Sequence, residues 1–426
     1  MMPLAVWGQT VREELQADVN RSAGISYVLP TDGTFTDTAA PEGYNPFYIS
    51  HYGCTTSFYL EDPKHYEAPY ATLAKADSLG KLTELGRDVL HRLDLLRREA
   101  SDRAGEVTAS GARQSRLLMR QMVERFPYTF FEGTGYYSAR SVVHNHCIET
   151  MNEAMVELSG LRQPLQMNIK ASKREVPFMD PHDKTLEAQR TDSATMAAYN
   201  AFVQRNTDDR RLMASLINDS DYVATHVDAG ELSRQLFTLA GNIQHTDLNG
   251  SMTLYDLFTP EEIHRHWRIR NAWNYICYGT CPTNGATQPY VQRASLRNMM
   301  HMGDSLMKRI SPIVHVRYTH EEVVMALACL MELDSCGMET DDLDKLEDLG
   351  WVDYRIAPVG GSIVMVHYRR RRFDDDVLVK VLLNGHEARL PMETDCAPYY
   401  HWDDVKRYYL RKLYRYENYR FTKQFR

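Results

Sequence analysis

The chain has 426 residues, of which 43% are hydrophobic and 25% charged, values ordinary for a globular protein with a large core. Its formal net charge of -8 excludes the strong positive field typical of nucleic-acid-binding proteins, so we expect no nucleic-acid partner. No apolar run reaches the roughly 20 residues that a membrane helix needs, so we expect no membrane span. The seven cysteines are scattered and odd in number, which argues against a disulfide framework.

Residues 1–41 form an N-terminal segment before the first predicted strand. Its opening, "MMPLAVWGQ", is short and apolar and is followed by charged sequence. This pattern is typical of the end of a signal peptide whose basic start is missing. We therefore expect a signal-peptide remnant at 1–8 and a periplasmic or secreted protein. If the N-terminus is genuine, the alternative is a cytoplasmic protein.

Strands and helices alternate in the first part of the chain. "PFYISHYG" (46–53) is predicted to be a buried strand that ends at a glycine. Helical spacing of apolar residues marks 81–99 and 108–126. "YTFFEGTGYYSAR" (128–140) then indicates a strand and turn, "SVVHNHCIETMNEAMVEL" (141–158) a helix, and "LQMNIKAS" (165–172) a strand.

The rest of the chain is helical before it returns to alternation. From about 193 to 309 the hydrophobic period is almost entirely helical. "SPIVHVRY" (311–318) is predicted to be a strand, 319–333 a helix, and 362–372 with 376–385 a hairpin. We therefore expect an α/β core of 42–180 and 305–405 interrupted by a helical insertion at 181–304.

The last residues, 406–426, interleave basic and aromatic side chains. We predict a C-terminal helix or tail with an aromatic stripe packed on the domain and a wet basic face. Binding of a polyanion or a glycan through this alternation is the alternative.

Several stretches resemble one family in the order of the chain. They are "PEGYNPFYISHYG", "LTELG", "GEVTASGARQSR", "SARSVVHNHCIETM" and "VHVRYTHEEVVMALACLM". The chain resembles the histidine phosphatase superfamily in its acid phosphatase and phytase branch, and within it bacterial proteins like the multiple inositol polyphosphate phosphatases. The resemblance implies a three-layer α/β/α sandwich of the phosphoglycerate mutase type, with a mostly helical insertion.

The family's chemistry uses a histidine nucleophile inside an Arg-His-Gly-x-Arg motif, with arginines that clamp the phosphoryl group. The resemblance places this motif directly after the first strand. In this chain Thr55 occupies the position of the nucleophile and Thr56 that of the glycine. The three arginine positions hold Cys54, Phe58 and His146.

The family's second histidine and its acid have counterparts. His320 matches the histidine, and the acid falls on Glu321 or, by a second form of the motif, on Glu322. These remnants permit a functional and a structural interpretation. In the structural one, Thr319 caps a helix whose first turn is acidic.

By the resemblance, this chain lacks the nucleophile and three guanidinium groups. Because one transition-state donor is worth roughly 10²–10³ in rate, their loss removes most of the catalysis. We predict a pseudophosphatase that needs no cofactor and keeps a cleft for a small anionic ligand or an unknown partner. The resemblance places in that cleft Cys54, Thr56, Phe58 and His146. We assign Arg140, which precedes the helix that carries His146, to the same cleft as an anion-binding group, and the alternative is an exposed or salt-bridged arginine.

Two alternatives stay open. The first is a phosphomonoester hydrolase of the phytase or inositol polyphosphate phosphatase kind with residual or altered activity. The second is a metal-binding variant, because thiolate and imidazole suit zinc and the removal of arginine lowers the repulsion of a cation. Our prediction is no metal, and the alternative ligands are Cys54, His146 and His320. The residues expected near them are His51, His144, Cys147 and Glu321.

Overall fold

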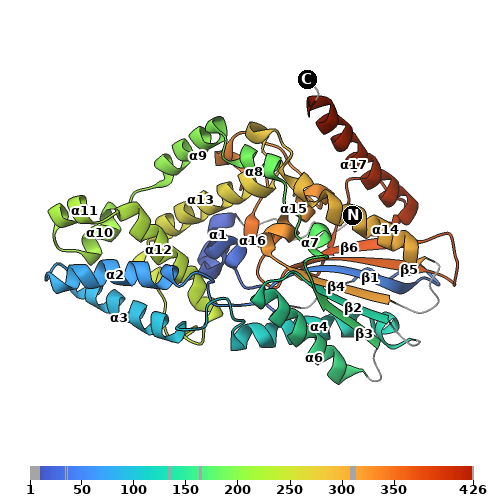
Figure 1. Ribbon diagram of the computed structural model, residues 1–426, viewed down its shortest axis with the longest axis horizontal. Coiled ribbons are helices and arrows are strands. Elements are labelled where there is room, and N and C mark those ends of the chain that lie inside the picture. The colour runs from blue at the N-terminus through green and yellow to red at the C-terminus, as the bar shows by residue number, and fades with distance from the viewer. Residues whose placement is uncertain are drawn as a thin grey trace.

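The computed structural model describes residues 10–33, 35, 37–132, 136–162, 166–307 and 313–424. The expected signal-peptide remnant at 1–8 lies outside these residues. Figure 1 shows a layered part built on a β-sheet and, beside it, a helical lobe.

One mixed sheet forms the centre of the layered part, in the order β3-β2-β4-β1-β5-β6-β7, with β8 beside β6. The first four strands of that order are parallel, and β5, β6 and β7 follow antiparallel. The predicted strands and the hairpin are present. The strands are β1 (Asn45–Cys54), β2 (Tyr136–Ser141), β3 (Gln166–Ala171), β4 (Ile313–Thr319), β5 (Ser362–Arg369), β6 (Leu378–Leu383), β7 (His386–Ala388) and β8 (Tyr400–His401).

Helices cover both faces of this sheet, because its strands bury side chains on both sides. On β1, Ile49 packs in one core together with Val123 of α4, whereas Tyr52 packs in the opposite core with Met325 of α15. The three-layer sandwich expected from the resemblance is therefore present. The helices of the layers are α4 (Ala109–Arg125), α5 (Pro127–Phe131) and α6 (Asn145–Leu161) on one face, and α7 (Val176–Met179), α14 (Arg293–Leu306) and α15 (Glu321–Met331) on the other.

The helical lobe is assembled from two separate stretches of sequence. Helices α2 (Lys64–Ser78) and α3 (Glu84–Glu99) precede the expected insertion, yet they share a hydrophobic core with α10 (Arg210–Leu216), α11 (Ser220–His226) and α12 (Ala229–Asn242). Helices α8 (Lys184–Arg190), α9 (Ser193–Asn206) and α13 (Pro260–Tyr278) run between the lobe and the sandwich (Figure 1). The lobe thus joins α2 and α3 to α10, α11 and α12.

The two Thr-x-x-Gly helix entries have the same physical basis. The hydroxyl oxygens of Thr83 and Thr108 accept hydrogen bonds from the backbone N–H groups of Gly86 and Gly111, which caps α3 and α4. Each glycine also lets a backbone approach closely. A Cβ on Gly111 would lie 2.1 Å from the carbonyl oxygen of Ser57.

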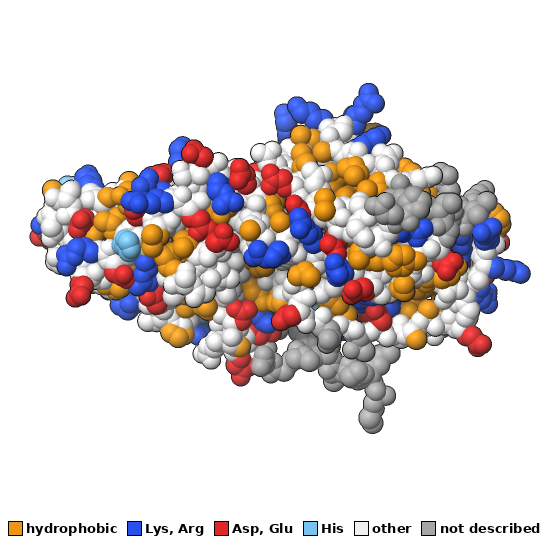
Figure 2. Space-filling view, turned by 90° about the horizontal axis from the view of Figure 1, so that it is seen from below, with side chains coloured by type: hydrophobic (Ala, Val, Ile, Leu, Met, Phe, Trp, Pro, Cys, Tyr) orange, Lys and Arg blue, Asp and Glu red, His pale blue; other side chains and the backbone are white. Residues whose placement is uncertain are grey.

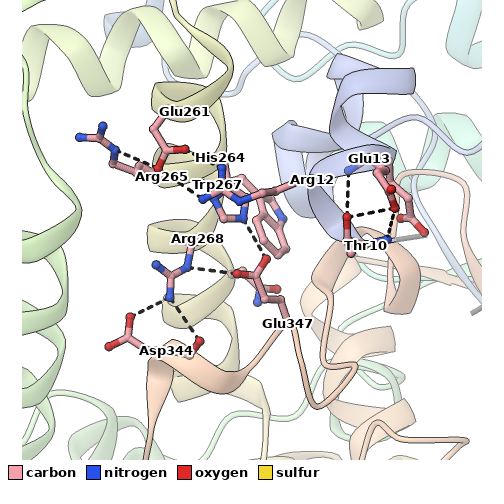
Figure 3. A network of polar contacts seen from close by, with 12 residues as sticks. Thr10, Arg12, Glu13, Glu261, His264, Arg265, Trp267, Arg268, Asp344 and Glu347 are labelled. Atoms are coloured by element: carbon pink, nitrogen blue, oxygen red, sulfur yellow. Dashed lines mark hydrogen bonds and ion pairs between the residues drawn. The ribbon is translucent and has the colours of Figure 1, made fainter. Parts of the chain in front are cut away.

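Helix α1 (Val11–Ala17) fastens the N-terminal segment to α13 (Figure 3). Arg12 forms an ion pair with Glu261 at the start of α13. Farther along α13, His264 contacts Glu347 and Arg268 contacts Asp344, and both acids lie in the segment before β5. These contacts join the N-terminus, the insertion and the sandwich.

Helix α17 (Trp402–Gln424) projects from the body of the molecule (Figure 1). Tyr409 and Leu413 are buried, whereas Tyr414 and Phe421 are exposed. One aromatic side of the helix therefore packs on the domain, as the sequence predicts.

On the face shown in Figure 2, basic and acidic side chains are interspersed over much of the surface.

Two local predictions need correction. Residues 127–131 form the short helix α5, because Pro127 occupies its first turn, and the strand begins only at Tyr136. His320, not Thr319, is the N-cap of α15, since the Thr319 hydroxyl donates to the carbonyl oxygen of Met179.

All seven cysteines are free thiols. Within the described residues, no helix is both long and apolar enough to cross a membrane.

Candidate functional site

The carboxyl ends of three parallel strands meet at one edge of the sheet. Cys54 at the end of β1 pairs in register with Thr319 of β4, and Ser141 of β2 pairs with Tyr318. The segments that follow these strands are therefore brought together, and such an edge is where open α/β sheets bind ligands. These segments are 55–58, 142–147 and 320–322.

The turn after β1 buries its polar side chains. Thr55 and Thr56 are fully buried, and the hydroxyl of Thr150 on α6 lies 3.2 Å and 3.0 Å from their hydroxyl oxygens. The Thr150 oxygen also accepts from the backbone N–H of Thr56 at 3.1 Å. A hydroxyl held in this way has no base beside it to make it a nucleophile. Thr55 thus serves the packing of the turn.

Phe58 closes the turn with an aromatic contact. Its ring is stacked on that of His146, with the centroids 4.3 Å apart and an interplanar angle of 14°. Two of the positions that the resemblance assigns to arginines therefore touch each other. The Phe58 ring covers one face of the His146 imidazole, and the pair does not offer the clamp of N–H donors that two guanidinium groups would form.

His320 begins α15 and faces the first turn of α6. Its Nδ1 lies 3.4 Å from Nε2 of His146 and 3.9 Å from Sγ of Cys147. The ring of His144, the N-cap of α6, stands edge-on to the ring of His320 with centroids 4.6 Å apart. The carboxylate of Glu61 lies 3.4 Å from Nδ1 of His146.

Burial sets the protonation of these groups. It lowers the pKa of His146 to about 3, and the neighbouring His320 and His144 add to that shift. Burial also raises the pKa of the Cys54 and Cys147 thiols, an effect that nearby carboxylates increase. At neutral pH, His146 is therefore uncharged and both cysteines are protonated. None of these three positions supplies a positive charge or a free thiolate.

The two acids after His320 have different surroundings. Glu321 is 7% exposed and its Oε1 has no hydrogen-bond partner, and burial together with Glu322 raises its pKa well above the ordinary value. Glu322 is partly exposed. Of the two, Glu322 is therefore the one that solvent reaches.

Arg140 lies on β2 and is held by its own sheet. Its Nη1 donates to the carbonyl oxygen of Asn168 at 2.6 Å and to that of Ala139 at 3.0 Å. Its Nε lies 3.7 Å from Glu175. These partners occupy the Arg140 guanidinium.

Cys54 and Thr56 also border a mainly apolar hollow beneath α4, together with His51, Met119 and Tyr318. The predicted site residues are thus divided between this hollow and the cluster of histidines. The sequence singled out every member of that cluster except Glu61 and Thr150. Neither residue lies in a recognisable motif, and only the packing of the loop after β1 against α6 brings them in.

No family model and no curated protein matches this sequence. Among solved structures, the multiple inositol polyphosphate phosphatase of Bifidobacterium longum in complex with inositol hexasulfate matches at a TM-score of 0.77 and 16% identity, over 91% of this chain and 97% of that one. The phytase from D. castellii matches at 0.66 and 12%, over 93% and 85%. The apo form of the Hafnia alvei phytase matches at 0.52 and 13%, over 88% and 98%. These matches confirm the fold expected from the resemblance.

Proposed function

We propose that this chain is a catalytically degenerate protein of the histidine phosphatase fold that keeps a ligand-binding cleft. One observation supports it most strongly. The turn after β1 holds Cys54, Thr55 and Phe58 where the family's motif has its clamp and nucleophile, and Phe58 stacks on His146, which stands at the third arginine position. A phosphoryl group here meets an aromatic ring and the neutral imidazole of His146.

The magnitudes favour inactivity. One transition-state donor is worth on the order of 10²–10³ in rate, so three missing guanidinium groups outweigh anything that a remnant histidine and acid can restore. Thr55 adds no nucleophile because its hydroxyl is buried against Thr150. The Cys54 thiol adds none either, since burial raises its pKa.

The second candidate is a phosphomonoesterase with residual or altered activity. It is supported by His320 at the end of β4 and by the partly exposed Glu322 beside it, which match the family's second histidine and acid. It is supported as well by the fold shared with an inositol polyphosphate phosphatase and two phytases.

Hydrolysis assays decide between the two candidates. Purified protein is incubated with p-nitrophenyl phosphate and with inositol hexakisphosphate from acid to neutral pH. Degeneracy predicts no phosphate release above the buffer rate. Release that is lost in the His320→Ala variant, with the fold intact by circular dichroism, would establish the second candidate instead.

A small anionic ligand in the cleft is part of the proposal, because the Bifidobacterium longum neighbour was solved with inositol hexasulfate and with phosphate. Calorimetric titration with each of these anions tests it. We also propose a periplasmic or secreted location, by the resemblance to exported phosphatases. Fractionation of the native host with an antibody to this chain tests that location.

A further inference from the structure

Three potential metal ligands meet where the first turn of α6 faces the start of α15. The ligand atoms of His146, Cys147 and His320 all lie within 4.8 Å of one another. His320 Nδ1 is 3.4 Å from His146 Nε2 and 3.9 Å from Cys147 Sγ. In a tetrahedral zinc site with bonds of about 2.0–2.3 Å, neighbouring ligand atoms are roughly 3.3–3.6 Å apart. The two separations from His320 are therefore within a few tenths of an ångström of the zinc spacing, and every pair of ligand atoms lies within 4.8 Å.

The side chains are held in place before any ion arrives. His146 and Cys147 are 1% and 0% exposed, and both belong to the first turn of a 17-residue helix, α6. His320 is fixed between the end of β4 and the start of α15. Ligands on such rigid elements need little rearrangement to bind an ion.

Glu61 lies beside one of the imidazoles. Its carboxylate lies 3.4 Å from Nδ1 of His146, the nitrogen opposite to the one that faces His320. A carboxylate that accepts from the outer nitrogen of a ligating histidine is the usual second-shell partner in zinc sites. In this structure Nδ1 of His146 makes no hydrogen bond, so Glu61 is placed to accept from it, and to turn Nε2 towards the cluster, once an ion binds.

The charges around the cluster favour a cation over an anion. Besides burial, four acidic groups raise the pKa of the Cys147 thiol, namely Glu321, Glu61, Asp180 and Glu322. At the arginine positions of the resemblance stand Cys54, Phe58 and His146, which carry no positive charge. The acids therefore favour a cation at the cluster itself, and a bound cation would supply the positive charge that an anionic ligand in the cleft needs.

We propose that His146 Nε2, Cys147 Sγ and His320 Nδ1 bind one divalent zinc-like ion, with Glu61 orienting His146. Imidazole and thiolate together are the ligands that zinc prefers, and Cys147 gives up its proton on binding. Three protein ligands leave a fourth position open to water or to a ligand in the cleft. The proposed function assigns no metal to the cleft, so this site goes beyond it.

The thiol ligand differs from the one considered from sequence. Cys147 takes the place of Cys54, which does not belong to the cluster. Within the described residues, Asp395, Cys396 and His401 form another group of comparable spacing. There Nε2 of His401 contacts Asp395 at 3.1 Å, and Asp395 is exposed. Cys54 lies outside both groups and Cys396 belongs to the second one. Substitution of either thiol therefore serves as a control for Cys147.

The test is metal binding by the full chain. Protein stripped with a chelator is titrated with Zn²⁺ and, separately, with Co²⁺, whose thiolate complexes absorb in the near ultraviolet. We expect one equivalent of metal per chain by elemental analysis after dialysis, and a cobalt–thiolate band. Cys147→Ser should abolish the band, and His320→Ala should lower the affinity at least tenfold. Cys54→Ser and Cys396→Ser should keep both band and stoichiometry.

Glu61→Gln guards against misfolded variants, because the Glu61 side chain is 57% exposed. Loss of this outer partner should weaken binding by about 10–100-fold without changing the stoichiometry. The proposal is overturned if the wild type retains no metal, if Cys147→Ser keeps the cobalt band, or if Cys396→Ser loses it. Hydrolysis measured on metal-free protein tests the proposed function separately.

Discussion

The helix entry at Thr108 and the turn 54–58 pack against each other, yet they relate differently to the phosphatase pattern. The N–H of Thr108 donates to the carbonyl oxygen of Ser57 at 2.9 Å, and Gly111 lies against the same carbonyl. The entry has the Thr-x-x-Gly pattern, whereas the turn carries Cys54, Thr55 and Phe58 at the positions that the resemblance assigns to the catalytic motif. Backbone sterics constrain the entry, and under the proposed function no catalysis constrains the turn. Scaffold and chemistry would then be separable in this molecule.

The largest expected effect comes from filling the space at this contact. Gly111→Ala places a Cβ 2.1 Å from a backbone oxygen, so α4 must move off the turn. We expect a loss of about 3 kcal/mol or more in the free energy of unfolding, measured by urea denaturation.

Gly160→Ala is the matched control, because Gly160 is an exposed helical glycine with nothing within 4 Å of an added Cβ. It should be neutral or stabilise the protein by roughly 0.5–1 kcal/mol. Equal effects of the two substitutions would show that the contact does not constrain the turn.

On the other side of the same turn, Thr150→Val removes the partner of Thr55 and Thr56. It leaves the buried N–H of Thr56 without its acceptor. Such a group costs about 1–3 kcal/mol, and we expect a drop of that size in the urea-derived stability. Thr225→Val, on an exposed helix position, should change stability by less than about 0.5 kcal/mol. A neutral Thr150→Val would mean that the turn does not depend on this hydroxyl.

The sequence could predict the sandwich because its strands and long helices have strong periodicity and because the family pattern is retained at the helix entries. It could also predict that His146 and His320 face one cleft, since both follow strands of one parallel set. It could not place Glu61 or Thr150, whose roles depend on how the loop after β1 packs on α6. Nor could it assign α2 and α3 to the lobe, because that is a matter of tertiary packing.

A smaller effect is expected far from the cleft, where Asp183 contacts Arg293 of α14 and Arg420 of α17. Although burial opposes it, the two guanidinium groups hold the pKa of Asp183 below its ordinary value. The ion pairs therefore add stability above the unfolded pKa, near 4, which is lost as the pH falls through the folded value. Asp183→Asn should flatten the acid-side slope of unfolding midpoint against pH. An unchanged slope would contradict this.

The smallest effect is expected at Arg140, which the resemblance puts in the cleft but whose guanidinium is bound to carbonyl oxygens of β2 and β3. Arg140→Lys should alter the affinity for Zn²⁺ less than twofold and stability by about 1 kcal/mol. Calorimetric titration of the metal-free protein measures the affinity, and urea denaturation measures the stability. A tenfold change in affinity would show that Arg140 acts on the metal cluster after all.

The central claim is that the family's scaffold remains while its phosphohistidine chemistry is gone. The most direct measurement is phosphate release from inositol hexakisphosphate by chelator-treated, metal-free protein, compared with its His320→Ala variant at the same concentration. The account predicts that both release phosphate at the rate of the buffer alone. Turnover by the metal-free wild type that disappears in His320→Ala would contradict it.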